Sequence, residues 1–228
     1  MSKIKLTRRL NTIASFVDSR KIADVGCDHG KLTAYLFENK LIDYALVSDI
    51  SAMSLSKAVS LLLDMKVNFE HIVCDGIYKY AKADLAIIAG MGGEEIIKIL
   101  KHNASTIKHF ILGPQHSEVE LKKYLVRNNY LIETDIFVCD NGKFYNIIKC
   151  VKSKSRHTIS HSQLLFGQNI PSADYADYID NRLDKVSNII SYMPYFKSLK
   201  MRKYLRDIKK AKLKLEKDNE RNTRISTN

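Results

Sequence analysis

Short runs of β-branched residues alternate with helix-length amphipathic stretches from Ile22 to about residue 151. This alternation is typical of strand and crossover helix in a parallel sheet, and it restricts the fold more than any other feature of the chain. The predicted strands are residues 22–25, 44–48, 71–73, 85–89 and 109–112. The predicted helices are residues 31–39, 52–65, 94–102 and 118–128. We therefore expect an α/β fold with a Rossmann-like sheet.

Two further apolar runs, residues 131–138 and 143–150, are separated by "CDNG". That turn signal predicts an antiparallel hairpin that closes the sheet. A purely dinucleotide-binding domain usually continues with parallel strands instead. By fold-level analogy, the hairpin is typical of a class I S-adenosylmethionine-dependent methyltransferase core.

The rest of the chain predicts helices. The polar segment "KSKSRHTISHS" is interpreted as a linker, and beyond it apolar residues recur at helical spacing on both sides of Pro194. The two stripes comprise Ile179, Leu183, Val186, Ile190 and Met193, then Met201, Leu205, Ile208 and Leu215. Two such helices predict a C-terminal α-helical coiled-coil domain.

Composition bounds the class of protein. The chain has 228 residues, of which 45% are hydrophobic, enough for a sizeable core. Its longest apolar runs fall far short of the roughly 20 residues of a membrane span, and no secretory signal is recognisable, so we expect a cytoplasmic protein. The cysteines include no CxxC pair, which argues against a zinc site and against a disulfide framework. They are Cys27, Cys74, Cys139 and Cys150.

Charge points to an anionic partner. The formal net charge is +12, and residues 151–228 contribute 17 basic against 8 acidic side chains. The excess therefore belongs to the tail, and it favours nucleic acid over a membrane surface. The alternative is a Lys-rich proteome in which basic proteins are general.

The segment "DVGCDHG", residues 24–30, follows an apolar strand and opens a helix, where open α/β sheets bind their ligands. Gly26 permits a tight turn and a close approach of backbone to ligand. The carboxylate of Asp28 would repel a phosphate bound at this loop. S-adenosylmethionine carries a positive sulfonium and a positive amino group, which suit Asp24 and Asp28. The alternative for Asp28 is a cap of the next helix.

Two more carboxylates follow strands. Asp49, beside Ile50, stands where a strand-end acid hydrogen-bonds ribose hydroxyls. Asp75 ends the third strand, and Gly76 allows a turn against which an adenine ring could pack; an Asx-turn is the alternative. Acids at the ends of three successive strands indicate a ligand site more specifically than any one of them does.

The segment "AGMGGEE", residues 89–95, follows the fourth strand, where methyltransferases place the residues nearest the transferring methyl. Gly90, Gly92 and Gly93 would keep the backbone low beside a ligand, and Met91 offers a soft apolar wall. A plain glycine loop is the alternative.

The order "LTRRLNTIA", "ADVGCDHGKL", "IAGMGG", "FILGP" and a basic helical tail resembles the bacterial tRNA adenine-N1 methyltransferases that modify adenine 22. The resemblance covers nearly the whole chain. It implies an S-adenosylmethionine-binding methyltransferase domain over residues 1–152 and a coiled-coil domain over 153–228 that helps hold tRNA. It also implies that Asp28 acts at the target adenine.

The candidate site residues form two groups. The predicted cofactor-binding residues are Asp24, Gly26, Asp28, Asp49, Ile50, Asp75, Gly76, Gly90, Met91 and Gly92. The predicted tRNA-binding residues are Arg8, Arg9, His29, Lys200, Lys203, Arg206, Lys209 and Lys210. No metal is expected, and a monomer is favoured. For His29 the alternative is a helix-capping histidine, and for the tail it is a solvated coiled coil.

The sequence departs from the family pattern in two places. Lys31-Leu32-Thr33 stands where family members usually carry a Tyr-Leu-Pro-like segment. Residues 112–115, "LGPQ", stand where they often show Leu-Gln-Pro-Asn, so Gln115 could offer its amide to an adenine edge one residue out of step.

Adenine N1 is itself a nucleophile, so its methylation needs alignment and exclusion of water more than a strong base. A carboxylate at Asp28 would stabilise the positive charge that develops on the adenine or orient the ring. The target adenine would have to be exposed or flipped into the pocket. Candidates to stack on it are Tyr78, Tyr80 and Tyr145, and core packing is the alternative for each.

Three other functions remain open. A nicotinamide-dependent oxidoreductase would require GxGxxG, whereas this chain has GxDxG. A catalytically inactive RNA-binding adaptor is disfavoured by the intact acids. A methyltransferase acting on another RNA, a protein or a small molecule is the third, and the fold alone does not exclude it.

Overall fold

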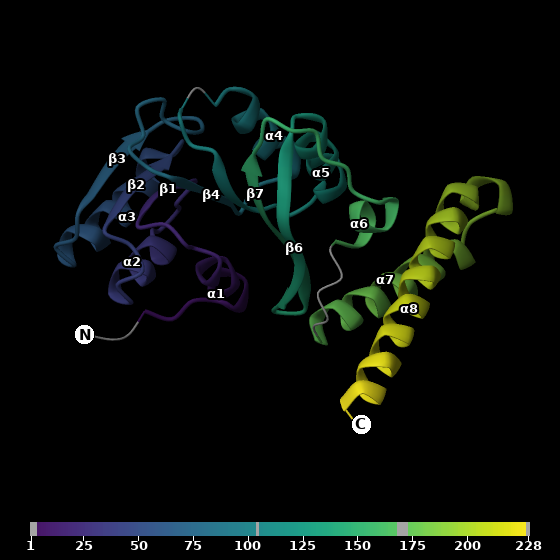
Figure 1. Cartoon of the computed structure of the whole chain (residues 1–228). Coiled ribbons are helices and arrows are strands. Elements are labelled where there is room, and N and C mark those ends of the chain that lie inside the picture. Colours follow the sequence, from purple (N-terminus) through teal and green to yellow (C-terminus); the bar gives the residue numbers. More distant parts are fainter. Residues whose placement is uncertain (1–3, 104, 168–172, 227–228) are drawn as a thin grey trace. The chain divides into compact units, whose positions relative to one another are not determined.

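The computed structural model describes residues 4–103, 105–167 and 173–226 (Figure 1). The chain divides into two compact units, Met1–Ile159 and Ser160–Asn228. The sequence placed the boundary earlier, between residues 152 and 153. Residues 153–159 belong with the first unit because Ser153 N donates to Asn129 O at 2.8 Å and Ile159 packs against a core cluster of the sheet.

The first unit contains a seven-stranded sheet with the order β3-β2-β1-β4-β5-β7-β6. Pairing is parallel from β3 through β5, and β7 runs antiparallel to both β5 and β6. The strands are β1 (Lys21–Val25), β2 (Tyr44–Asp49), β3 (Phe69–Val73), β4 (Leu85–Ala89), β5 (His109–Gly113), β6 (Tyr130–Asp140) and β7 (Lys143–Lys152). The five predicted strands and the predicted hairpin are confirmed.

Helices cover both faces of this sheet (Figure 1). One face packs against α1 (Arg8–Ser15), α2 (Lys31–Glu38) and α3 (Ala52–Asp64), and the other against α4 (Gly93–Lys101) and α5 (Glu118–Arg127). The position of β4 between the two groups of helices explains why its sequence is apolar at every position. Leu85 and Ile87 face the first group of helices, and Ala86 and Ile88 face the second, so every residue of the strand interior is buried.

The strand order creates the binding edge. From β1 the chain proceeds to β2 and β3 on one side, and then returns to place β4 on the other side of β1. The connections that leave β1 and β4 therefore diverge at their carboxyl ends. A crevice at such a topological switch point is where doubly wound sheets bind ligands.

The second unit consists of helices: α6 (His161–Phe166), α7 (Ala173–Ser191), the 3₁₀ helix η1 (Tyr195–Ser198) and α8 (Leu199–Ser226). Helices α7 and α8 run side by side (Figure 1). Ile179 and Ile208 from the two predicted stripes are fully buried, and Lys212 Nζ lies 2.7 Å from Asp180 Oδ1.

Helix α6 corrects the interpretation of residues 152–162 as a linker throughout. Ser160 Oγ accepts from Gln163 N at 3.1 Å, and Gln163 Oε1 accepts from Ser160 N at 2.8 Å. This capping box is a helix-start signal that the sequence carries and that polarity alone obscured. The helix ends with buried Phe166, whose ring stacks on Tyr204.

None of the described helices combines the length and apolar character of a membrane-spanning segment.

Candidate active site

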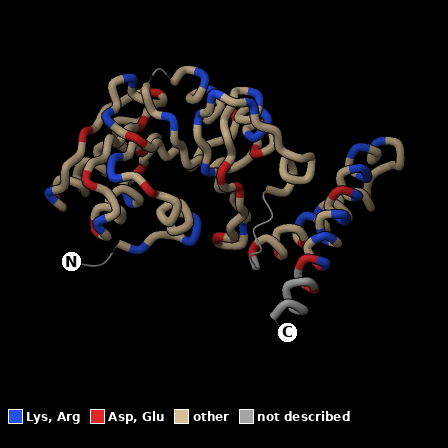
Figure 2. Tube along the Cα trace, viewed as in Figure 1, with Lys and Arg blue, Asp and Glu red and all other residues tan. Residues whose placement is uncertain are grey.

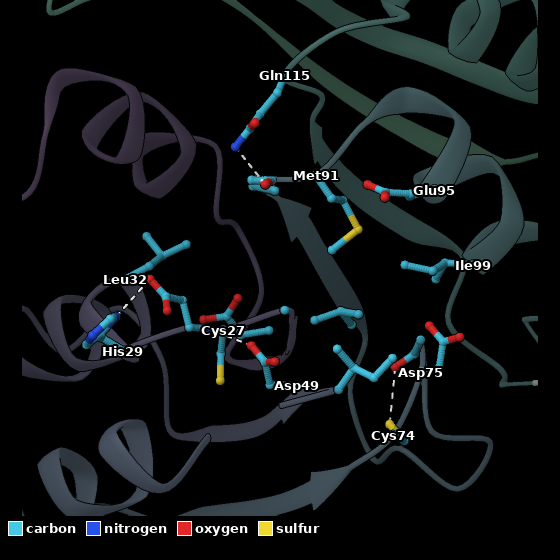
Figure 3. A pocket seen from close by; sticks show the side chains of 18 of the residues that line it. Cys27, His29, Leu32, Asp49, Cys74, Asp75, Met91, Glu95, Ile99 and Gln115 are labelled. Carbon is cyan, nitrogen blue, oxygen red and sulfur yellow. Dashed lines mark hydrogen bonds and ion pairs between the residues drawn. The ribbon is translucent and has the colours of Figure 1, made fainter. Parts of the chain in front are cut away.

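A cleft of about 990 Å³ opens at the carboxyl edge of the parallel strands, with walls from α1, the β1–α2 loop, the ends of β2, β3 and β4, and α4. Most of the residues predicted to bind a cofactor line it. They are Asp24, Gly26, Asp28, Asp49, Ile50, Asp75, Gly76, Gly90 and Met91. Figure 3 shows Asp49 and Asp75 on one side of the cleft and Met91 pointing toward them from the other.

Gly92 does not line the cleft. Its N–H donates to Glu95 Oε2 at 2.7 Å at the start of α4, and a Cβ at Gly92 would stand 2.5 Å from the His116 ring. Close packing against His116 therefore explains this glycine.

The glycine loop bends tightly after β1. Gly26 has φ +72°, and the amides of Gly26 and Cys27 both donate to Ser48 O of β2, at 2.8 and 3.0 Å. A Cβ at Gly26 would stand 2.8 Å from Met91 Cε. The positive φ favours glycine at this position, and without a side chain here the floor of the cleft is bare backbone against the end of Met91.

Asp49 couples the loop to the next helix. Its Oδ2 accepts from Asp28 N at 3.1 Å, and its Oδ1 accepts from Ser51 N at 2.8 Å. The end of β2 thus fixes both the glycine loop and the start of α3. A carboxylate oxygen has two lone pairs, so each keeps acceptor capacity for a ligand.

Asp24 is the most buried acid of the cleft, with 5% exposure. Burial raises its pKa to about 6, against the effect of a 2.6 Å hydrogen bond from Thr33 Oγ1 that lowers it. The negative charge of Asp49 raises it further. A positively charged ligand nearby would relieve this cost of burying a carboxylate.

Asp28 sits above the loop in the left-handed region, with φ +49°, a conformation that Asp tolerates better than most residues. Its Oδ2 lies 2.8 Å from His29 Nδ1, and His29 Nε2 lies 3.2 Å from Lys57 Nζ. Asp28 is exposed and is held by a neighbouring ring rather than by a helix-capping bond. The next helix, α2, has Gly30 as its N-cap, so the capping alternative for Asp28 is wrong.

The loops after β4 and β5 are tied together beside Met91. Gln115 Nε2 donates to Gly90 O at 2.7 Å, Gln115 N donates to Met91 O at 3.0 Å, and Gly90 N donates to Gly113 O at 3.2 Å. Gln115 lines the cleft, and its side-chain amide nitrogen holds the loop after β4 in place.

One wall of the cleft was not predicted from the sequence. Glu95, Lys98 and Ile99 of α4 line it, together with the C-cap residue His102. Their spacing of three and four places them on one helix face, and this periodicity was the available signal.

The predicted basic residues lie in different places. Arg9 and His29 line the cleft, and the Arg9 guanidinium lies 5.0 Å from the centroid of the Tyr145 ring. Arg8 begins α1 and does not line the cleft. The remaining predicted side chains are exposed on α8: Lys200, Lys203, Arg206, Lys209 and Lys210.

Comparison with known proteins agrees with this geometry. A family model described as "Methyltransferase domain" matches residues 6–148. A Mycoplasma pneumoniae protein named as a tRNA methyltransferase is 33% identical over 173 residues, covering 72% of this chain and 81% of that protein. The Bacillus subtilis tRNA (adenine(22)-N(1))-methyltransferase is 27% identical over 156 residues, covering 65% of this chain and 66% of that protein.

A solved structure extends the likeness. TrmK of M. capricolum, in complex with S-adenosyl-homocysteine, matches with a TM-score of 0.81 at 26% identity. The match covers 90% of this chain and 97% of that chain. The family match spans all the strands but the end of β7 and every acid of the cleft. The chain therefore belongs to the methyltransferase-domain family, and the two relatives described above are named as tRNA methyltransferases.

Proposed function

We propose that this protein transfers a methyl group from S-adenosylmethionine to N1 of adenine 22 in tRNA, in the cytoplasm. The observation that carries the proposal is the cleft in which strand-end acids from β1, β2 and β3 surround a bare glycine loop. The relatives with the same fold include an enzyme named for this reaction.

The residues of the cleft fit S-adenosylmethionine. Its sulfonium and amino groups are positive, and Asp24, buried at a cost to its charged form, gains from a positive neighbour. The bare backbone at Gly26 and Gly90 also fits S-adenosylmethionine. Gly26 and Gly90 have φ of +72° and +89°, and a Cβ at Gly26 would displace the end of Met91, so a larger residue at either position would strain the loop or narrow the floor.

Different residues of the cleft would bind different parts of the cofactor. Asp49 would hold the ribose hydroxyls through the acceptor capacity left after its two backbone bonds. Asp75, Gly76 and Ile50 would flank the adenine ring of the cofactor. Met91 would form the apolar wall beside the sulfur.

When bound, S-adenosylmethionine supplies an electrophilic methyl group. Asp28 stands at the mouth of the cleft, where its carboxylate stabilises positive charge on the target adenine and orients its exocyclic amino group. His29 orients Asp28, and Gln115 with the loop after β4 helps exclude water beside the reacting atoms. A proton abstraction is not required because adenine N1 carries its own lone pair.

The tRNA would be held by both units. Arg9, Arg8 and His29 belong to the first, and in the second α7 and α8 would form a coiled-coil hairpin whose basic side chains contact phosphates. Contacts of this kind give affinity and placement, whereas the cleft selects the base. We propose that the protein acts as a monomer, with the first unit, residues 1–159, as the methyltransferase domain and the second unit, residues 160–228, as the tRNA-binding domain.

The direct test is methyl transfer from labelled S-adenosylmethionine to unmodified total tRNA, with the product nucleoside identified by mass spectrometry and mapped. N1-methyladenosine at position 22 is the expected result. Transfer to another position, to another RNA or to a protein would show that the protein has a different target from the proposed one. Cofactor binding by calorimetry without transfer to any of these would indicate an RNA-binding adaptor instead.

A further inference from the structure

The turn between α7 and α8 exposes large apolar side chains that the unit itself does not bury. Tyr192 is 90% exposed, Phe196 is 84% exposed, Tyr195 is 61% exposed and Leu199 is 49% exposed. We call these four residues the aromatic tip. Scattered exposed apolar residues are ordinary, but four within eight positions form a patch, and such patches mark binding sites.

The aromatic tip is held rigidly. Pro194 O accepts from Lys197 N and Ser198 N, both at 3.1 Å, which closes the turn of η1. The fully buried Ser198 donates its hydroxyl to Tyr195 O at 2.8 Å and accepts from Arg202 Nε at 2.8 Å. The Arg202 guanidinium in turn lies 4.9 Å from the centroid of the Tyr195 ring. The exposed rings therefore project from a fixed backbone, which lowers the entropic cost of binding.

The charge around the aromatic tip has one sign. Residues 191–206 contain no Asp or Glu, and Figure 2 shows Lys and Arg following one another from the turn into α8. The basic residues of this stretch are Lys197, Lys200, Arg202, Lys203 and Arg206. A second copy of the same surface would bring these like charges together, so self-association through the tip is disfavoured.

Exposed aromatic rings among basic side chains are the combination that binds single-stranded nucleic acid, because bases stack on the rings while the cations track the phosphates. We propose that the aromatic tip is a stacking site for unpaired nucleobases of an RNA loop, separate from the pocket that receives the target base. The RNA is the tRNA substrate, so the inference rests on the proposed function.

The absence of tryptophan from the chain allows a direct probe. Phe196→Trp would place a single tryptophan at the aromatic tip, where a stacked base quenches its fluorescence. Leu63→Trp is the matched control, since Leu63 is 61% exposed in the last turn of α3, away from the carboxyl edge of the sheet. Both full-length variants would be titrated with unmodified tRNA, with a short single-stranded oligonucleotide and with anionic phospholipid vesicles.

We expect tRNA and the oligonucleotide to quench the fluorescence of the Phe196→Trp protein and to leave that of the Leu63→Trp protein unchanged. No quenching at position 196, or equal quenching at both positions, would overturn the inference. A response to vesicles alone would also overturn it, and would assign the tip to a lipid surface.

A second measurement separates stacking from charge. Tyr192→Ala combined with Phe196→Ala should weaken tRNA binding about 10-fold or more while leaving the slope of log K against log salt unchanged. Lys200→Ser combined with Lys203→Ser should instead reduce that slope by about 2. If the aromatic variant binds tRNA as the wild type does, the tip takes no part.

The two proposals can fail separately. Methylation of adenine 22 by the wild type, without quenching at position 196, would remove the stacking site and keep the proposed function. Quenching at position 196 without methylation would do the reverse.

Discussion

His29 Nδ1 lies 2.8 Å from Asp28 Oδ2, and the opposite nitrogen of the same ring lies 3.2 Å from Lys57 Nζ. An ammonium group only donates, so Nε2 accepts from Lys57 and Nδ1 carries the proton that is directed at Asp28. The ring thereby turns the Asp28 carboxylate to a fixed direction at the mouth of the cleft.

Asp28→Asn should separate chemistry from binding. Asn has nearly the same size and also tolerates the left-handed backbone found at this position, so the loop keeps its shape. We expect the single-turnover rate of methyl transfer to fall about 100-fold, because the stabilising charge is lost. Affinity for S-adenosylmethionine, measured by calorimetry, should fall by less than about 10-fold.

The exposed Asp64 at the end of α3 provides the control, since Asp64→Asn should change neither quantity. If Asp28→Asn alters neither rate nor affinity, Asp28 has no part in the mechanism.

Gly26→Ala and Gly142→Ala form a matched pair. Both glycines have a positive φ, +72° and +74°, so alanine at either costs on the order of 1 kcal/mol of stability. At Gly26 a Cβ would also stand 2.8 Å from Met91 Cε and displace the flexible end of that side chain, whereas nothing lies within 4 Å of a Cβ at Gly142.

We therefore expect both variants to lower the midpoint of thermal unfolding, and Gly26→Ala alone to weaken cofactor binding measured by calorimetry, because Met91 has to move within the cleft. Normal binding by Gly26→Ala would mean that the loop does not form the floor of the cofactor site.

Asp24 should make the stability of the apoprotein depend on pH. Burial raises its pKa from 3.8 to about 6, so the folded state binds its proton more tightly than the unfolded state. The resulting stabilisation is fully present below about pH 4 and is lost as pH rises through about 6, by up to about 3 kcal/mol. Urea unfolding from pH 4 to pH 8 would measure it.

Asp24→Asn removes the titrating group and keeps an oxygen for the hydrogen bond from Thr33. The difference in unfolding free energy between wild type and variant should therefore change across that pH range. A constant difference would show that Asp24 titrates normally.

Lys122 and Asp135 form an ion pair inside the first unit. Their side chains are 0% and 1% exposed, with Lys122 Nζ 3.1 Å from Asp135 Oδ2, and Asn146 Nδ2 donates to Asp135 Oδ1 at 2.6 Å. Burial raises the pKa of Asp135 and outweighs the opposing effect of the Lys122 charge. Lys122→Met should cost about 3–5 kcal/mol, because it leaves a buried carboxylate without its cation.

Lys122→Met combined with Asp135→Leu should recover most of that loss in urea unfolding. The adjacent, exposed Lys123 supplies the control, since Lys123→Met should stay within about 0.5 kcal/mol of wild type. A small effect of Lys122→Met alone would contradict the pairing.

The strand and helix pattern was readable from the sequence because each signal is local. The run from Leu85 to Ala89 is apolar at every position, and the "CDNG" turn joins β6 to β7, so both elements were predicted within a few residues. The positions of Asp24, Asp49 and Asp75 followed from a rule about topology, since parallel strands that share a sheet end at one edge.

Only the tertiary structure decided which surfaces meet at that edge. The close approach of Met91 to Gly26 joins two loops that are far apart in the chain, and the wall of Glu95, Lys98 and His102 depends on how α4 packs. Gly92 likewise proved to pack against His116 rather than to line the cleft. The sequence by itself determined the order of strands and helices and the acids that follow them, because periodicity and turn chemistry act over a few residues. The shape of the cleft and the raised pKa of Asp24 depend on distant segments that come together only when the sheet and its helices pack.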